Sequence, residues 1–369
     1  MRLVVLPGDG IGPEISSATV DILQLLSDRL GLELTFETHE IGLVTLKRDG
    51  TTFPMPAFEA CRKADGIVLG PISHNVYPPR AEGGINVSGE LRLSLDLYAN
   101  LRPSRSREGL PHYGRTPMDL VIVRENTEGF YSDRNMHMGI GEFMPSPDMA
   151  LSIRKVTAVA SRRIAVAAFE LAMTRQKKIT AVHKANVLRI SDALFLREVR
   201  DVAKKYPAVA YEEQLVDSMA ALLVRDAAHY DVIVTTNMFG DILSDEAAEL
   251  SGSLGLGSSI NAGDTHCMAQ AQHGSAPAIA GQDKANPASL ILSAGMLLDW
   301  LARKHRNEKF ARAGVLVENA IDVLLKNPAT RTPDLGGSLG TRAFTAALRE
   351  ELEQQLTGSR HAAQTAKHL

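Results

Sequence analysis

A chain of 369 residues is longer than one hydrophobic core usually supports, which predicts two domains. Its 44% hydrophobic and 22% charged residues are typical of a folded globular protein, and a net charge of −3 argues against a nucleic acid partner. No apolar run approaches the roughly 20 residues of a membrane span, the N-terminus lacks a signal-peptide pattern, and two cysteines, Cys61 and Cys267, make no disulfide framework, so we expect a cytoplasmic protein with no membrane partner.

Strand and helix patterns alternate from the start of the chain. Arg2–Leu6 predicts a strand and Ile15–Leu30 an amphipathic helix, with the glycine-rich turn PGDGIGPE between them. Such a turn suits a phosphate at a helix N-terminus, but it lacks the G-x-G-x-x-G spacing and by itself indicates only a tight turn. Further strands at 34–38 and 66–69 predict an α/β fold with a parallel sheet.

The segments between these elements carry other signals. Residues 71–89 form a long loop rich in Pro, Gly and Asn, a common setting for binding. A helix is predicted from Gly89 until Pro103 ends it. Residues 135–150, rich in Met, Gly and Pro, fit a projecting arm, and residues 356–369 are expected to be a flexible tail.

Several predicted strands end at polar or charged residues. These residues are Arg124, Lys184, Asp217 and Asp241. Ligands collect at the carboxyl ends of the strands in an open α/β sheet. A purely structural protein has no evident need for an arginine, a lysine and acids at all these ends, which favours a ligand-binding site.

Val232–Leu256 shows the clearest chemical pattern. A β-branched run breaks at Asn237 and Gly240 and leads into a helix that has Asp241 and Asp245 four residues apart. At that spacing the two carboxylates share one helix face, and two hard oxygen donors favour Mg²⁺ or Mn²⁺ over zinc. The alternative is an acidic first turn that suits the helix dipole, with Asp245 merely solvated.

Six stretches in order along the chain carry a resemblance to a known family: PGDGIGPEI, RENTEGFYSD, HKANVLRISD, NMFGDILSDEAAELSGSLGL, HGSAPAIAGQDKANP and RTPDLGG. With them the chain resembles the β-decarboxylating dehydrogenases, which include isocitrate, homoisocitrate, isopropylmalate, tartrate and D-malate dehydrogenases. The resemblance implies a two-domain α/β fold that is not a Rossmann fold. Residues 1–98 and 252–355 would form a large cofactor-binding domain, and residues 99–251 a smaller dimerisation domain with the arm. It also implies a homodimer whose active sites, in the interdomain cleft, are shared between subunits.

Family substrates are malate-type 2-hydroxy acids that have a carboxylate on the neighbouring carbon. The positions that match substrate contacts are Asn86, Ser88, Arg92, Arg102, Arg124 and Asn186. A guanidinium group suits a carboxylate better than an ammonium group does, because it donates two parallel hydrogen bonds. Single arginines usually make ordinary ion pairs, but three at motif positions favour substrate binding.

The resemblance also implies the catalytic and metal-binding roles. Lys184, approached by Asp217, matches the base that takes the proton of the 2-hydroxyl group. Tyr131 matches the acid that protonates the enol carbon after decarboxylation. Asp241 and Asp245, with Asp217 from the other subunit, match the ligands of the Mg²⁺ or Mn²⁺ that acts as a Lewis acid.

The cofactor-binding positions implied by the resemblance are Ile11, His273, Gly274, Ser275, Ala276, Ala278 and Asn286. At the position that matches Ala278, NAD-linked members usually carry an acidic residue. NADP-linked bacterial isocitrate enzymes carry Lys-Tyr at the two positions that match Ala278 and Ile279. Neither signature is present. The RTPDLGG stretch resembles that of NAD-linked members, so NAD is expected and NADP stays open.

The substrate-selecting segment is GGINVSGELR. Isopropylmalate enzymes place an apolar pair where this chain has Ser88 and Gly89, which cannot supply the walls of an apolar pocket. Isocitrate enzymes use Ser-x-Asn, and the order is reversed as Asn86-x-Ser88. An isocitrate-like or homoisocitrate-like substrate is therefore favoured, and 3-isopropylmalate, tartrate and D-malate dehydrogenases remain alternatives. A non-catalytic regulatory subunit is the competing class, but the retained tyrosine, lysine and three aspartates argue for catalysis.

Overall fold

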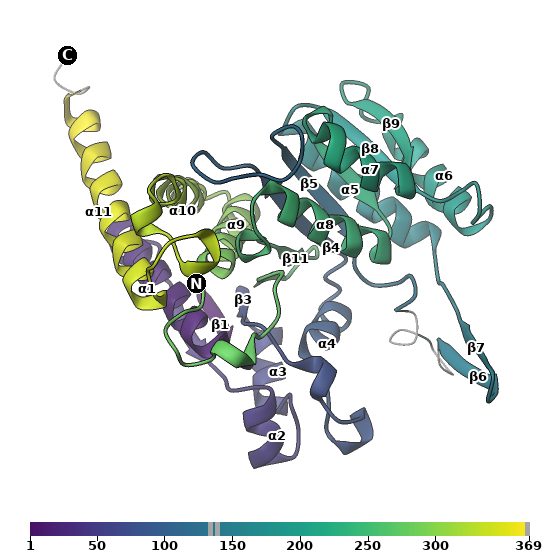
Figure 1. Ribbon diagram of the computed structural model, residues 1–369, viewed down its shortest axis with the longest axis horizontal. Coiled ribbons are helices and arrows are strands. Elements are labelled where there is room, and N and C mark those ends of the chain that lie inside the picture. The colour runs from purple at the N-terminus through teal and green to yellow at the C-terminus, as the bar shows by residue number, and fades with distance from the viewer. Residues whose placement is uncertain (132–135, 137–140, 366–369) are drawn as a thin grey trace. The chain divides into compact units, whose positions relative to one another are not determined.

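The computed structural model describes the backbone of residues 1–131, 136 and 141–365. The chain divides into two compact units (Figure 1). Unit 1 comprises Met1–Val87, Arg107–Leu110 and Cys267–Leu369, and unit 2 comprises Ser88–Ser106 and Pro111–His266. These divisions fall near the domain boundaries predicted after residues 98 and 251, without coinciding with them. None of the described helices combines the length and the apolar character that crossing a bilayer requires.

Unit 1 contains four parallel strands in the order β2-β1-β3-β12. Their bounds are β1 Arg2–Leu6, β2 Thr35–Thr38, β3 Gly66–Leu69 and β12 Cys267–Gln270. All four residues of β3 and the apolar residues of β1 are buried. This is the pattern of a parallel sheet covered on both faces, and its strands read as continuous apolar runs in the sequence.

The helices of unit 1 are α1 Gly12–Leu30, α2 Leu43–Asp49, α3 Met55–Arg62, α9 Ala288–His305, α10 Glu308–Lys326 and α11 Thr341–Thr365. Helices α9 and α10 cross closely at two glycines, since a Cβ on Gly314 would lie 2.9 Å from the carbonyl oxygen of Gly295. Helix α11 extends to Thr365 and so includes part of the tail predicted from residue 356; its buried residues Leu348, Leu352 and Leu356 follow the amphipathic pattern of a helix. The last four residues of that tail, 366–369, lie outside the described residues.

Unit 2 contains strands in the order β11-β4-β5-β10-β8-β9. Their bounds are β4 Ala99–Arg105, β5 Asp119–Glu125, β8 Lys178–His183, β9 Ala210–Leu215, β10 Val232–Thr235 and β11 Ile260–Ala262. Strands β5, β10, β8 and β9 run parallel, whereas β4 runs antiparallel to both β5 and β11. The expectation of a purely parallel sheet is therefore wrong for β4 and β11.

Strand β4 also corrects the helix predicted from Gly89 to Pro103. That helix, α4 (Val87–Ser94), stops early, and the following residues form β4 instead. Pro103 is tolerated because β11 pairs with β4 only as far as Leu101, so no strand lies beside the proline on that side.

Two pairs of helices pack on opposite faces of the sheet in unit 2. They are α5 Ala158–Met173 with α6 Ser191–Ala203, and α7 Val216–Asp226 with α8 Asn237–Ser251. Alternate side chains of β5 belong to different hydrophobic cores. Val121 and Val123 pack with α5 and α6, whereas Leu120 and Ile122 pack with α7 and α8.

The described part of the predicted arm is a two-stranded antiparallel hairpin, visible in Figure 1. It consists of β6 Glu142–Ser146 and β7 Met149–Ser152, and its side chains are largely exposed, including Met144. Residues 135 and 137–140 of the predicted arm lie outside the described residues. Backbone hydrogen bonds in both directions between Gly129 and Lys155 join the two chain segments that lead into and out of the arm.

Candidate active site

Helix α8 brings Asp241 and Asp245 close to strand β5. The helix begins directly after β10, and its glycine, Gly240, faces Arg124 of β5. A Cβ at Gly240 would lie 2.7 Å from the Cβ and Cγ atoms of that arginine. The Gly-Asp pair in the sequence therefore has a direct reason, because only glycine allows α8 to approach β5 this closely.

Two buried arginines contact the two aspartates. Arg102 Nη1 lies 3.1 Å from Asp241 Oδ1 and 3.2 Å from Asp245 Oδ1, and Arg124 Nη1 also pairs with Asp241. The side chains of Arg102 and Arg124 are only 7% and 3% exposed. The cluster thus places two positive and two negative groups at one end of the strands.

The two aspartates are electrostatically unequal. Burial favours the neutral form of Asp241, but Arg124, Arg102 and Arg92 outweigh it, and the pKa of Asp241 is lowered. For Asp245 burial dominates over the attraction of Arg102, and its pKa is raised. Burial and the charge of Arg102 lower the pKa of Arg124 to about 10, so it stays charged at neutral pH.

Two asparagines that were not predicted as site residues orient these arginines. Asn237 Oδ1 accepts hydrogen bonds from Arg124 Nη2 at 2.7 Å and Nε at 3.1 Å. Asn100 Oδ1 accepts from Arg102 Nε at 2.6 Å. The sequence contains one local indication of their role, which is that Asn237 interrupts the apolar run before α8. Its contact with Arg124 depends on the fold and leaves no pattern in the sequence.

Tyr131 joins the same cluster. Its hydroxyl donates to Asp241 Oδ2 at 3.3 Å, and the guanidinium carbon of Arg124 lies 5.9 Å from its ring centroid. Arg92 belongs to α4, one turn beyond Ser88, and its charge acts on Asp241. The structure therefore brings together most of the substrate, metal and acid residues predicted on unit 2.

Lys184 and Asp217 form a separate pair. Lys184 follows β8 and Asp217 follows β9, and the register of these neighbouring strands pairs His183 with Leu215. Lys184 Nζ consequently lies 2.5 Å from Asp217 Oδ1, and this hydrogen bond lowers the pKa of the aspartate. Asn186 is exposed on the turn after Lys184.

The described carboxylates of one chain do not complete a metal site. Among the described residues, no group of three or more His, Cys, Asp or Glu side chains is arranged to hold a metal ion. Asp241 and Asp245 do offer two hard oxygen donors on one helix face, and these fit Mg²⁺ or Mn²⁺ with further ligands from elsewhere. Asp217 does not join these two aspartates in a ligand group among the described residues.

The predicted cofactor residues lie on unit 1, around the glycine-rich turn and the loop after β12. The backbone N–H of Ile11 donates to the carbonyl of Ser275 at 2.8 Å. A Cβ at Gly10 would lie 2.0 Å from that carbonyl oxygen, so only glycine permits the contact. The side chain of Ser275 lies 2.7 Å from the hydroxyl of Ser73. The glycine-rich turn therefore packs against the loop after β12, and we call these two segments together the loop cluster of unit 1.

Buried polar atoms without partners mark this cluster as fit for a polar ligand. Among the described residues, His273 Nε2 and both amide atoms of Gln272 have no hydrogen-bond partner. Burial lowers the pKa of His273, whose Nδ1 lies 3.0 Å from the carbonyl oxygen of Gly274. Such atoms are costly unless a ligand satisfies them, which fits a dinucleotide.

The remaining predicted cofactor residues frame the loop. Gly274, Ala276 and Ala278 are exposed. Asn286 Nδ2 donates to Asp334 Oδ2 at 2.9 Å, which links the loop to the RTPDLGG stretch. Ala278 presents an exposed methyl group where an acidic or a basic side chain would contact the adenosine ribose of NAD or NADP.

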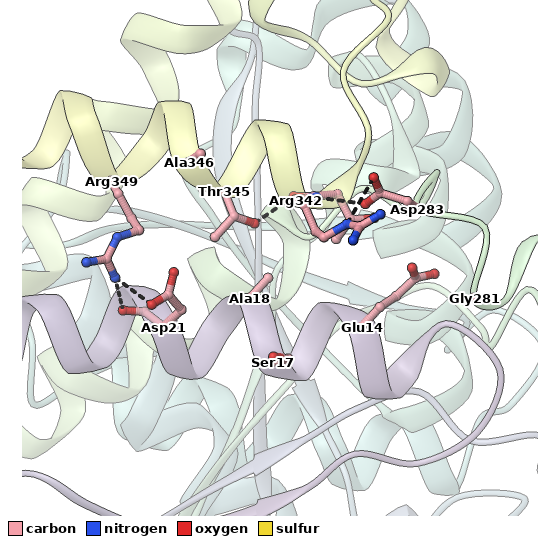
Figure 2. Close-up of a pocket in the computed structure, with 11 residues that line it drawn as sticks. Glu14, Ser17, Ala18, Asp21, Gly281, Asp283, Arg342, Thr345, Ala346 and Arg349 are labelled. Carbon is pink, nitrogen blue, oxygen red and sulfur yellow. Dashed lines mark hydrogen bonds and ion pairs between the residues drawn. The ribbon is translucent and has the colours of Figure 1, made fainter.

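A cavity of about 550 Å³ lies between α1 and α11, beside Gly281 and Asp283 of the loop after β12 (Figure 2). Its two arginines are each paired with an aspartate: Arg342 with Asp283 and Arg349 with Asp21. Glu14 of α1 also lines the cavity, where burial raises its pKa. These contacts hold the loop against the helices, and we assign the cavity a structural role.

The chain is similar to known proteins over nearly its whole length. A sequence model of the family described as isocitrate/isopropylmalate dehydrogenase matches residues 2–352. The chain is 40% identical to a 3-isopropylmalate dehydrogenase of Saccharolobus solfataricus, over 91% of this chain and 95% of that protein. It is 41% identical to an isocitrate/homoisocitrate dehydrogenase of Thermus thermophilus, over 95% and 98%. A crystal structure of isocitrate dehydrogenase from Methylococcus capsulatus superposes with a TM-score of 0.83 at 36% identity, over 95% of this chain and 99% of that one.

Proposed function

Because the chain belongs to the isocitrate/isopropylmalate dehydrogenase family, whose members are NAD(P)-dependent β-decarboxylating dehydrogenases, we propose that it oxidises and decarboxylates a malate-type 2-hydroxy acid with a polar substituent, of the isocitrate or homoisocitrate kind. The observation that carries this proposal is the cluster of Arg102, Arg124, Tyr131 and the two aspartates of α8. It combines cationic groups for a carboxylate, oxygen donors for a cation and a proton donor.

The arginines and aspartates of this cluster are suited to exchange partners. Buried guanidinium groups need counter-charges, and Asp241 and Asp245 supply them. When a divalent cation takes the two carboxylates, Arg102 and Arg124 can pair with the carboxylates of the substrate instead. The positive charges that hold the site together would thereby also select a dianionic or trianionic substrate.

The proposed ligands of Mg²⁺ or Mn²⁺ are Asp241 and Asp245 of one subunit and Asp217 of the other. The bound cation would stabilise the enolate formed by loss of CO₂, and the nicotinamide would accept the hydride. Lys184, beside Asp217, takes the proton of the 2-hydroxyl group. Tyr131 donates a proton to the enol carbon from its position against Asp241.

The separation of these groups supports the proposed homodimer with shared sites. Asp217 does not join the aspartates of α8 within the described chain, so a second subunit is proposed to supply it together with Lys184. Exposed apolar side chains on unit 2 offer a surface for such an interface, including Ile242 on α8, which is 59% exposed, and Met144 on the arm hairpin. Burying such residues against a second copy would stabilise the dimer.

NAD is the proposed cofactor, held by the loop cluster of unit 1, and NADP is the alternative. The buried unpaired atoms of Gln272 and His273 support a polar ligand there. The tie between Asn286 and Asp334 supports NAD, because it places the RTPDLGG stretch, which resembles that of NAD-linked members, at this loop.

The substrate is proposed from Ser88 and Gly89, because overall identity does not separate the relatives. Relatives named 3-isopropylmalate dehydrogenase are 38–40% identical to this chain, and relatives named isocitrate/homoisocitrate or homoisocitrate dehydrogenase are 38–41% identical to it. Ser88 is buried and begins the face of α4 that also presents Arg92. A serine and a glycine favour a polar substituent over an isopropyl group. Oxidation of 3-isopropylmalate is the second candidate, because relatives of that name match over nearly their whole length.

The purified protein is expected to reduce NAD with isocitrate or homoisocitrate in the presence of Mg²⁺ or Mn²⁺, and to lose this activity when a chelator removes the metal. The test is a panel of isocitrate, homoisocitrate, 3-isopropylmalate, tartrate and D-malate, each run with NAD and with NADP. The highest kcat/KM with 3-isopropylmalate would contradict the polar-substituent assignment. Turnover of no member of the panel, together with activation of a catalytic partner, would show a regulatory subunit.

Replacing Ser88 with leucine is expected to shift kcat/KM toward 3-isopropylmalate relative to isocitrate by about tenfold or more, since one apolar contact discriminates by roughly 10- to 200-fold. Ser94→Leu is the matched control, because it adds the same side chain to the exposed end of α4. An unchanged ratio in Ser88→Leu would show that this position does not contact the substituent.

A further inference from the structure

A buried ion pair in unit 2 lies outside the clusters described above. Arg154 follows the arm hairpin, and Asp192 lies in the first turn of α6. Arg154 Nη1 is 2.5 Å from Asp192 Oδ1, and their side chains are 8% and 0% exposed. A buried ion pair adds little to stability, because desolvation of the two charges offsets much of their attraction. Its other contacts indicate a role in positioning neighbouring segments.

Asp192 contacts the segment that presents the proposed base. Its second carboxylate oxygen, Oδ2, accepts the backbone N–H of Lys184 at 2.6 Å. The same turn is closed by the N–H of Leu188 donating to the carbonyl of Lys184 at 2.8 Å, and by the N–H of Asp192 donating to the carbonyl of Leu188. Asp192 therefore determines where the Cα of Lys184 lies at the end of β8.

Arg154 connects this turn to the helix of the proposed metal ligands. Its Nη2 donates to Oγ1 of Thr236 at 2.9 Å, and its guanidinium carbon lies 5.3 Å from the ring centroid of Phe239. Thr236 directly precedes α8. With its carboxylate satisfied on both oxygens, Asp192 is held on one side by Arg154 and holds Lys184 on the other.

We propose that Asp192, oriented by Arg154, is a positioning residue that places Lys184 for proton transfer in the active site to which the lysine contributes. This rests on the proposed function, in which that site belongs to the partner subunit and uses the partner's aspartates of α8. The general base must lie within hydrogen-bonding reach of the substrate hydroxyl, so a displacement of its backbone lowers the rate more than it weakens substrate binding.

The substitution Asp192→Asn tests this with little change of shape. Arg154 and the N–H of Lys184 donate to different oxygens of Asp192, and asparagine replaces one of these oxygens with an NH2 group that cannot accept, so one of the two contacts is lost. We expect kcat to fall by about 10- to 100-fold, the range that a displacement of about 1 Å produces, with KM changed less than threefold. Glu198→Gln is the matched control, because Glu198 is an equally buried, ion-paired carboxylate on the same helix that does not contact Lys184.

Hybrid dimers separate positioning from general damage to the fold. A subunit inactivated by Lys184→Met and one inactivated by Asp241→Asn leave one intact site, which uses the lysine of the second subunit and the aspartates of the first. Asp192→Asn is added either to the subunit that supplies the lysine or to the subunit that supplies the aspartates. Both hybrids contain the same three substitutions, and two affinity tags isolate each of them.

We expect the activity to fall about 10- to 100-fold only when Asp192→Asn is in the subunit that supplies Lys184. Equal losses in both arrangements, or no loss in either, would overturn the positioning role. If the hybrid without Asp192→Asn is itself inactive, the shared site fails, and this proposal fails with it.

Arg154→Lys provides a second test if the asparagine variant does not fold. A lysine keeps a positive charge beside Asp192, but its single amine cannot also reach Thr236 as the guanidinium does. The same dependence on the lysine-supplying subunit is expected, with a smaller loss of kcat. A loss that follows the aspartate-supplying subunit instead would contradict the proposal.

Discussion

Homodimers carrying Lys184→Met and homodimers carrying Asp241→Asn are each expected to be inactive, whereas the hybrid of the two is expected to recover about half of the wild-type activity. Removing a general base costs about 10²- to 10⁴-fold in rate, and removing a metal carboxylate leaves too few hard donors for the cation. In the hybrid, one of the two sites contains an intact Lys184 and an intact Asp241, and the other site contains both substitutions.

The physical basis of this expectation is the arrangement of charges in one chain. Lys184 contacts Asp217, whereas Asp241 contacts Arg102, Arg124 and Tyr131. The two sets form no common metal site among the described residues. A symmetric dimer can bring the first set of one subunit to the second set of the other, and it forms two such sites at once.

The measurement is the rate of NAD reduction by hybrids purified through two different affinity tags. A wild-type dimer with the same two tags defines full activity, and a doubly tagged Asp241→Asn homodimer defines the background. Recovery in the hybrid excludes a site built within one subunit. A hybrid as inactive as its parents would show that each chain holds its own base and metal ligands.

Tyr131→Phe is expected to lower the rate of the decarboxylation and protonation half-reaction by about 10²- to 10⁴-fold while hydride transfer falls far less. The substitution removes only the hydroxyl that donates to Asp241 Oδ2. The ring and its contact with Arg124 remain, so substrate binding is expected to change little.

Supplying the 2-oxo acid intermediate separates the two half-reactions. Its reduction by NADH reports hydride transfer, and its conversion with release of CO₂ reports decarboxylation and protonation. Tyr211→Phe is the matched control, because its hydroxyl donates to Glu213 on the edge strand β9. Equal losses of both half-reactions in Tyr131→Phe would contradict its role as the acid.

Local sequence patterns sufficed for the elements that are buried on both faces. Strands β1 and β3 begin and end where their apolar runs predicted, and α8 begins at the break after β10. The same patterns failed for β4, whose sequence alternates polar and apolar residues around a proline. Its polar residues Asn100 and Arg102 are buried because the fold supplies partners for them, and no local pattern contains that information.

The sequence by itself determined the family and the reaction class. It also determined that Asp241 and Asp245 share one helix face, because residues four positions apart on a helix lie on the same side. Only the tertiary structure decided what these carboxylates contact. Arg124 and Asn237 are 113 positions apart and Arg154 and Asp192 are 38 apart, yet each pair is in direct contact. Such contacts depend on strand order and helix packing, which bring distant residues together without leaving a local periodicity in the chain.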